Sequence, residues 1–373
     1  MGRAMTVRLL SMSDIPDINR LHRQVWWPER SPEGWRWLID NPAAVEAAIP
    51  SGLVLEDSDG QACAFLGSFV QRFWQGDKIF YGSSGFSIIV PPKVRGASRQ
   101  LLSTFLALPS LSAHYTLNCN ALSSPLYKRF GMKPWPLATH DLKLAWIIRP
   151  LACVAARGLR HLVMRKPSSV HWLGERLLPR ASSFEPTRLG PDMEVVEDLS
   201  DSGDYAAYWQ ALKATGRFMA DRSPAMLRWR FSDPDLTHPI FMIVARQDGQ
   251  IVAHAMAMMS KYSSIEPATL EILDLDGLPH GRDRIAGLVQ TLIDQAAPLG
   301  AAKLRLQVVN PVLLDDLGDL VGKARFEGGY GHCHFQMAEG FEGDQTWQPT
   351  PFDGDYSICW RPLPHAEDRI RAA

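Results

Sequence analysis

One stretch of the chain combines an apolar strand, a short basic turn and an amphipathic helix. Ile89 and Val90 end the apolar run, two prolines follow, and the turn places Lys93, Arg95 and Gly96 directly ahead of the helix. The first amide groups of a helix are unpaired donors at its positive end, and glycine lets a ligand approach the backbone closely. This pattern is typical of a turn that binds a phosphate or pyrophosphate group.

A second block with chemical potential lies about one helix and one strand further along. Asn120 follows an apolar strand, and Tyr127 lies near the end of a short helix that Gly131 and Met132 follow. A phenol, with an ordinary pKa of about 10, can serve as a general acid toward a departing anion. The alternative role for Tyr127 is packing on the core with its hydroxyl in solvent.

Together, the two blocks resemble the acyl-CoA loop and the Asn-then-Tyr block of the GNAT acyltransferase superfamily. The superfamily's loop reads Gln or Arg, two residues, Gly, one residue, then Gly or Ala, and Lys93, Gly96 and Ser98 align with those positions. Lys93 and Ser98 are conservative departures, and Met132 stands where an aromatic residue is usual. The matched blocks span residues 85–132, and the expected order of strands extends the resemblance over the first half of the chain.

The resemblance implies that acetyl-CoA or another acyl-CoA binds at the turn as a co-substrate. It also implies that the Tyr127 hydroxyl lies near the CoA sulfur and protonates the departing thiolate, so Tyr127 is the expected catalytic residue. The strand before the turn has no carboxylate after Asp77, which leaves the general base unassigned and favours water-mediated deprotonation or an unusual acceptor. The expected cofactor-binding residues are Ile89, Val90, Lys93, Val94, Arg95, Gly96, Ala97, Ser98 and Asn120.

Two stretches of the chain repeat the same order of features. A Trp-Arg block around Trp37 precedes an apolar strand and an Asp-Gly-Gln turn at 59–61, and a block around Trp229 precedes a turn at 248–250. Shared order and spacing predict two copies of one fold. The alternative is that short Trp-Arg blocks and Asp-Gly turns coincide by chance.

Within each copy, the order of strands and helices predicts an α/β fold of the mixed α+β kind. We expect two GNAT-like domains, each with a mostly antiparallel central sheet flanked by helices. The first, at 1–148, would bind acyl-CoA and end in a closing strand at 142–148. A basic helical linker at 149–190 and a degenerate second copy at 191–373 would follow.

The second copy lacks the features of the phosphate-binding turn. It has Pro279 to Arg284 at the corresponding place, and Asp283 would face a phosphate unfavourably. We therefore expect acyl-CoA to bind the first copy, with the second shaping the acceptor site or bracing the first.

The linker carries eight Lys or Arg residues against two acidic residues, Glu175 and Glu185. This charge would suit a membrane surface or an acidic partner. The alternative is a linker that packs on both domains with a solvated basic face.

Composition excludes several classes of protein. The formal net charge of −1 creates no general field for nucleic acid, and none is expected as a partner. Five scattered cysteines without CxxC spacing indicate a reducing compartment, so we expect a cytoplasmic protein without a transmembrane segment. His332 and His334 lack a second ligand pair, so no metal is expected. We expect the His114 side chain to lie at the surface or at a sheet edge, and not to act as the general base.

These observations predict an acyltransferase that moves an acyl group from acyl-CoA to an amine or hydroxyl of a small-molecule or peptide acceptor by direct attack. One alternative is a non-catalytic tandem scaffold that binds CoA or a partner protein. Another is an aminoacyl transferase that draws on tRNA, which the lack of a strongly basic surface weakens.

Overall fold

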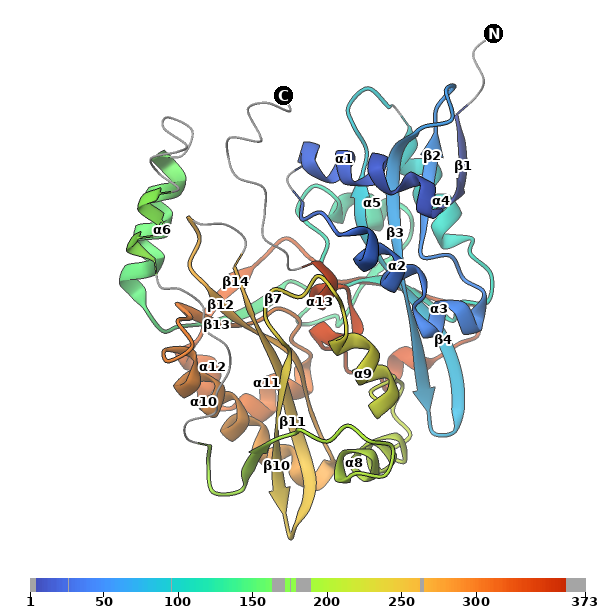
Figure 1. The fold of residues 1–373 in the computed structure, drawn as a ribbon. Coiled ribbons are helices and arrows are strands. Elements are labelled where there is room, and N and C mark those ends of the chain that lie inside the picture. The colour runs from blue at the N-terminus through green and yellow to red at the C-terminus, as the bar shows by residue number, and fades with distance from the viewer. Residues whose placement is uncertain are drawn as a thin grey trace.

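The protein, described here from a computed structural model, contains two mixed sheets, one in each half of the molecule, with helices around them (Figure 1). The structure describes residues 5–25, 27–94, 96–162, 172–174, 176–178, 189–261 and 265–359. This architecture confirms the predicted mixed α/β class.

The first sheet is antiparallel except for one parallel pair, β4 with β5. In spatial order its strands are β1 (Thr6–Leu9), β2 (Gly52–Glu56), β3 (Ala62–Gln75), β4 (Lys78–Ile89), β5 (Ala113–Thr116), β15 (His334–Met337) and β6 (Lys133–Pro134), and β9 (Met219–Ala220) also pairs with β3.

The second sheet repeats this plan. In the corresponding order its strands are β8 (Met193–Val195), β10 (Phe241–Gln247), β11 (Gln250–Ser260), β12 (Thr269–Gly277), β13 (Lys303–Leu306), β7 (Leu142–Ile147) and β14 (Arg325–Gly328). Its one parallel pair, β12 with β13, stands where β4 and β5 stand in the first sheet. The shared order confirms that the chain contains two copies of one fold.

The closing strand of each copy lies in the other copy's sheet, which corrects the expectation that residues 142–148 close the first sheet. β7 pairs with β13 and β14 of the second sheet (Figure 1). β15 pairs with β5 and β6 of the first. Leu144 and Trp146 of β7 pack into the second core. An apolar alternation predicts a strand, but either sheet offers β7 an edge beside its parallel pair, so the pattern does not choose between them.

Helices cover both faces of the first sheet. On one face, Ile18 of α1 and Trp35 of α2 pack with Phe69 of β3. On the other, Leu101 of α4 and Tyr127 of α5 pack with the opposite side chains of the same sheet. The helices of the chain include α1 (Ile15–Val25), α2 (Pro32–Ile39), α3 (Pro42–Ala47), α4 (Ala97–Leu106), α5 (Ser124–Arg129), α6 (Pro150–Leu162), α8 (Asp204–Lys213), α9 (Pro224–Phe231), α10 (Ile285–Ala296), α11 (Pro311–Leu317), α12 (Asp319–Lys323) and α13 (Tyr356–Cys359), with short 3₁₀ turns at η1 (Met12–Asp14), η2 (Pro279–Arg284), η3 (Gly343–Gln345) and η4 (Pro351–Asp353).

The two repeated Trp-Arg blocks form α2 and α9, which meet where the two halves pack together. Each helix has a serine N-cap followed by proline at its first position. Trp37 and Trp229, which occupy the same position in their repeats, stack with ring centroids 4.3 Å apart and planes 8° from parallel. Nearby, Arg30 and Asp233 form a buried ion pair at 2.7 Å. Equivalent residues therefore contact each other across the junction, as in a two-fold symmetric interface.

The predicted linker region includes α6, whose residues Ala156 and Leu159 pack beside Ile265 and Ala302 of the second half. Residues 163–171, 175 and 179–188 of the linker lie outside the described residues. No helix in the described part of the chain is both long and apolar enough to cross a membrane.

Candidate functional site

The predicted phosphate-binding turn joins β4 to α4. Gly96 is the N-cap of α4 and has a φ of 82°, a left-handed conformation that favours glycine. A Cβ atom built on Gly96 would meet no atom within 4 Å, so the backbone conformation, and not crowding, accounts for glycine. The amides of Arg99 and Gln100 bond to the Gly96 carbonyl, which leaves those of Ala97 and Ser98 ahead of the first intrahelical bonds.

The other expected residues of the turn divide into an exposed group and a packed group. Lys93 is exposed, as suits a cation that meets a charged ligand. Ile89 is buried, and Val90 and Val94 pack against the apolar cluster beneath α4. Arg95 lies outside the described residues.

β4 is bulged just before this turn. Phe86 and Ile89 pair with Gly67 and Phe65 of β3, so β4 holds one extra residue between the two pairs. Ser87, within the bulge, has a φ of 49°. A bulge increases the local twist and redirects the strand.

Beyond the parallel ladder, β4 and β5 part at a point that we call the strand fork. The ladder joins Gly82, Ser83 and Ser84 to Ala113, His114 and Tyr115, after which β4 continues to Ile89 while β5 ends at Thr116. An extended ligand that carries amide groups can pair with a strand at such a place, as peptides do when they add to a sheet edge.

Tyr127 lies at the strand fork on the face covered by α4 and α5. Its side chain is 2% exposed. A Cβ atom built on Gly85 of β4 would lie 3.5 Å from the Tyr127 hydroxyl oxygen. Burial raises the pKa of Tyr127 well above its ordinary value, and a hydrogen bond with the Thr116 side chain opposes this shift. The structure thus brings Tyr127 to the end of the parallel ladder.

The exchanged strand β15 supports the helix that carries Tyr127. The Ser124 hydroxyl of α5 lies 3.0 Å from Nε2 of His334, and the His334 ring stacks on Tyr127 with centroids 6.2 Å apart. His334 belongs to the second copy by sequence and to the first sheet by pairing. The second half of the chain therefore contributes directly to the position of Tyr127.

Asn120 shapes the start of α5. Its Oδ1 accepts hydrogen bonds from the amides of Leu122 and Ser123, at 3.0 and 2.9 Å. Its carbonyl accepts from the Ser124 amide. Asn120 therefore holds the turn between β5 and α5, while its expected contact with the cofactor stays a prediction.

The expectation for His114 is wrong, because its side chain is buried. Its ring packs edge-on against Phe105 of α4, and burial lowers its pKa to about 4. Cys119 is also buried, and desolvation raises the pKa of its thiol to about 12. A histidine covered by a helix and a thiol that stays protonated do not favour a covalent cysteine route.

Residues 353–356 pack on the opposite face of the strand fork, a contact that no sequence pattern predicted. The Tyr115 hydroxyl donates to the Asp353 carbonyl, and the Tyr356 hydroxyl donates to the Leu117 carbonyl, both at 2.7 Å. Gly354 and Asp355 form a turn between these two contacts. The Asp-Gly-Asp sequence is typical of a turn, but no pattern in the sequence predicts that this turn contacts β5.

Residues 349–350, just before this segment, contact the corresponding fork of the second sheet. The β12–β13 ladder ends at Ile272 and Leu306. Just beyond, the Thr350 hydroxyl donates to Asp274 at 2.6 Å, and the Asn310 amide donates to the Pro349 carbonyl at 3.2 Å. The two sheets therefore share an order of strands, and residues 349–356 contact the forks of both.

The two histidines considered as metal ligands have other partners. Nε2 of His332 lies 2.7 Å from the Gln307 carbonyl, and Nε2 of His334 lies 3.0 Å from the Gly331 carbonyl. Within the described residues, no group of three or more His, Cys, Asp or Glu side chains could hold a metal ion.

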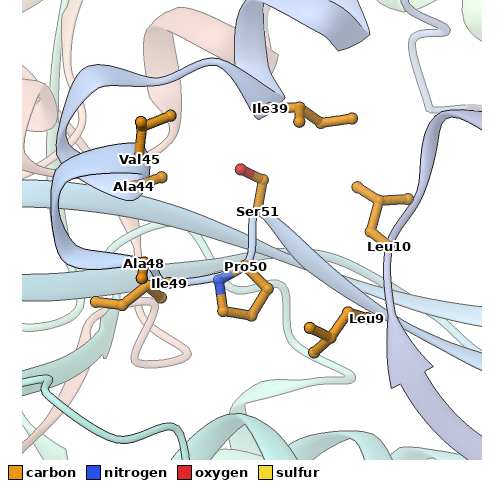
Figure 2. Close-up of a pocket in the computed structure, with 9 residues that line it drawn as sticks. All are labelled: Leu9, Leu10, Ile39, Ala44, Val45, Ala48, Ile49, Pro50 and Ser51. Atoms are coloured by element: carbon orange, nitrogen blue, oxygen red, sulfur yellow. The ribbon is translucent and has the colours of Figure 1, made fainter.

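An apolar pocket of about 260 Å³ lies beside α2 and α3 (Figure 2). Leu9 and Leu10 line one side, and Val45 and Ile49 are among the residues on the other. In the sheet, β2 and β3 separate β1 from β4, so the pocket does not adjoin the strand fork.

No family model and no curated protein matches the sequence. Solved structures do match it over 90% of its length. They include a probable N-acyltransferase from Enterococcus faecalis V583 (TM-score 0.51, 10% identity, 73% of that chain) and a GCN5-related N-acetyltransferase from Anabaena variabilis ATCC 29413 (TM-score 0.51, 13% identity, 73% of that chain). An N-myristoyltransferase from Saccharomyces cerevisiae, solved with bound myristoyl-CoA and inhibitors, also matches (TM-score 0.52, 10% identity, 80% of that chain). The chain therefore has a GNAT-like fold, present in two copies in tandem.

Proposed function

We propose that the protein is an acyltransferase that moves an acyl group from acyl-CoA to an amine. The observation that carries this proposal is that the Tyr127 hydroxyl lies beside Gly85 at the strand fork, on the same strand that leads to the Gly96 turn and the start of α4. Proteins of this fold include a myristoyl-CoA-bound N-myristoyltransferase, which supports an acyl-CoA co-substrate.

In this proposal, the turn holds the pyrophosphate of CoA. The amides of Ala97 and Ser98 would donate to phosphate oxygens, and Lys93 would neutralise part of their charge. The CoA arm would follow β4 past its bulge, with its amide groups paired to the backbone of the strand. The thioester would then lie near Gly85, beside Tyr127.

Tyr127 would stabilise the departing thiolate. Because burial raises the pKa of this phenol, outright ionisation to a tyrosinate is unfavourable. We therefore assign it the role of a hydrogen-bond donor that passes its proton to sulfur only as it receives one from the nitrogen of the new amide. The first copy alone would bind acyl-CoA, because Asp283 stands in the turn of the second copy and the Thr350 hydroxyl bonds to Asp274 just beyond the end of its parallel ladder.

Release of free CoA thiol tests the proposal. Purified full-length protein is mixed with acetyl-, octanoyl- or myristoyl-CoA and a panel of amines comprising amino acids, polyamines and short peptides with a free N-terminus. We expect thiol release that depends on one acyl-CoA and on an amine, and a product with the mass of the amide. Binding of acyl-CoA without release with any amine or with water would instead favour the non-catalytic scaffold.

A further inference from the structure

Two buried polar atoms lie unpaired on the face of the strand fork opposite Tyr127. Asp355 is 4% exposed, and its Oδ1 has no hydrogen-bond partner among the described residues. Ser84 is fully buried on β4, and its hydroxyl likewise has none. An unsatisfied buried polar group costs stability, so such groups often mark a site where a ligand supplies the missing partner.

Contacts on either side of Asp355 fix its position at the fork. A Cβ atom built on Gly354 would lie 3.2 Å from Cβ of Leu117, and the Tyr356 hydroxyl bonds to the Leu117 carbonyl. Asp355 therefore lies where β5 ends. Ser84 pairs with Tyr115, which bonds to the carbonyl of Asp353 in the same segment. Because side chains alternate along a strand, Ser84 and Gly85 face opposite sides, so Asp355 and Tyr127 flank the fork from opposite faces.

We propose that Asp355 is the general base that deprotonates the acceptor ammonium. This inference rests on the proposed acyl transfer and adds the group that takes the first proton. Asp355 Oδ1 accepts a proton from the ammonium, and the freed amine attacks the thioester carbonyl. The carbon–nitrogen bond forms and the carbon–sulfur bond breaks. Sulfur leaves with a proton from Tyr127, Tyr127 recovers one from the amide nitrogen, and Asp355 releases its proton to solvent.

The surroundings of Asp355 suit this role. Burial raises the pKa of its carboxyl, which strengthens it as a base, while its Oδ2 keeps one hydrogen bond from the Cys359 thiol at 3.0 Å. A hydrogen bond with the Asn118 side chain and the positive charge of Lys143 both act to lower the pKa of Asp355, against the effect of burial. The titratable groups that interact with the carboxyl, through their charge or a hydrogen bond, are Tyr115 of β5, Cys119 just beyond it, Tyr127 of α5, Lys143 of β7, Cys333 before β15, and Tyr356 and Cys359 of α13.

The variant D355N tests the proposal in the thiol-release assay with an amine that the wild-type protein accepts. We expect turnover to fall by about 10²- to 10⁴-fold, with the acyl-CoA dissociation constant unchanged. The wild-type rate should rise with pH as Asp355 ionises, and D355N should lack this limb. D355N should also melt no lower than wild type at pH 7, since it removes a buried carboxyl that ionises at a cost. Because the pKa of Asp355 is raised in the folded protein, the stability of wild type should decline as pH rises through the range between the unfolded and folded pKa values of this group.

The variant C359A is the matched control, because it keeps the carboxylate and removes one donor to it. Loss of that hydrogen bond should raise the pKa of Asp355 further, so the limb of the pH profile should move to higher pH. If D355N retains turnover within threefold of wild type, Asp355 is not the base and the proposed acyl transfer stands. If wild-type protein binds acyl-CoA but releases no thiol with any amine or with water, both proposals fall.

Discussion

Tyr127 differs from a phenylalanine by one hydroxyl group, and that group lies at the strand fork beside Gly85. The variant Tyr127→Phe keeps the ring that stacks on His334 and removes only the donor. We expect turnover to fall by about 10²- to 10³-fold, the usual effect of losing one donor to a developing anion. The acyl-CoA dissociation constant should stay the same, because the donor matters mainly as charge develops on sulfur.

Turnover and the dissociation constant, measured on Tyr127→Phe and wild type, check this prediction. Unchanged turnover would return Tyr127 to a packing role. A weakened affinity for acyl-CoA would instead make its hydroxyl a binding contact.

At the residue scale, the sequence supported local inferences better than distant ones. The turn at Gly96 and the place of Tyr127 beside β4 depend on residues within one strand-helix-strand-helix unit, so their spacing was informative. His114 was misplaced because α4 covers it, and a lone histidine in a short strand does not reveal which face a helix occupies. Asp355 could not be assigned, because its approach to β5 depends on packing between segments far apart in the chain.

Among the elements, α2 and α9 carry the contact that best reports how the two halves are joined. Trp37 and Trp229 stack face to face, and the Trp37 indole also donates to the Trp229 carbonyl at 3.0 Å. We expect Trp37→Ala and Trp229→Ala each to lower the free energy of unfolding by roughly 3 kcal/mol. In a double-mutant cycle, their coupling should be about 0.5 to 1.5 kcal/mol.

Urea unfolding of the two single variants and the double variant measures this coupling. Trp172→Ala is the control, because Trp172 is 52% exposed and should change stability by less than about 0.5 kcal/mol. Additive effects of Trp37 and Trp229 would mean that the stack contributes nothing beyond the burial of each ring.

The elements themselves were largely predictable. The apolar strand expected before the turn is β4, and the helix expected after Gly96 is α4. Their periodicity is strong because one face of each packs on a core. The exchange of β7 and β15 was not predictable, since strand pairing between the two copies depends on which sheet edge is nearer in space.

At the scale of the whole molecule, duplication has produced two forks of which one is open to a ligand by our account. In the second, η4 and the residues before it are anchored by a buried network that joins Arg222 to Asp274 at 2.6 Å and to Asp353 at 3.0 Å. The same segment then continues to Asp355 at the first fork. One stretch of chain thus contacts both forks. Because Asp283 stands in the turn of the second copy, we expect one acyl-CoA site per chain.

Titration calorimetry with acyl-CoA on wild-type protein and on Gly96→Glu measures whether each chain has one acyl-CoA site and whether that site is the Gly96 turn. We expect one site per chain for wild type and no detectable binding for Gly96→Glu, because the new carboxylate would lie where the pyrophosphate is proposed to bind. Gly60→Glu is the matched control: Gly60 has the same φ of 82° and equally open surroundings, at a hairpin away from the turn, so its variant should bind normally. Two sites per chain, or binding that survives in Gly96→Glu, would contradict a single acyl-CoA site at the Gly96 turn.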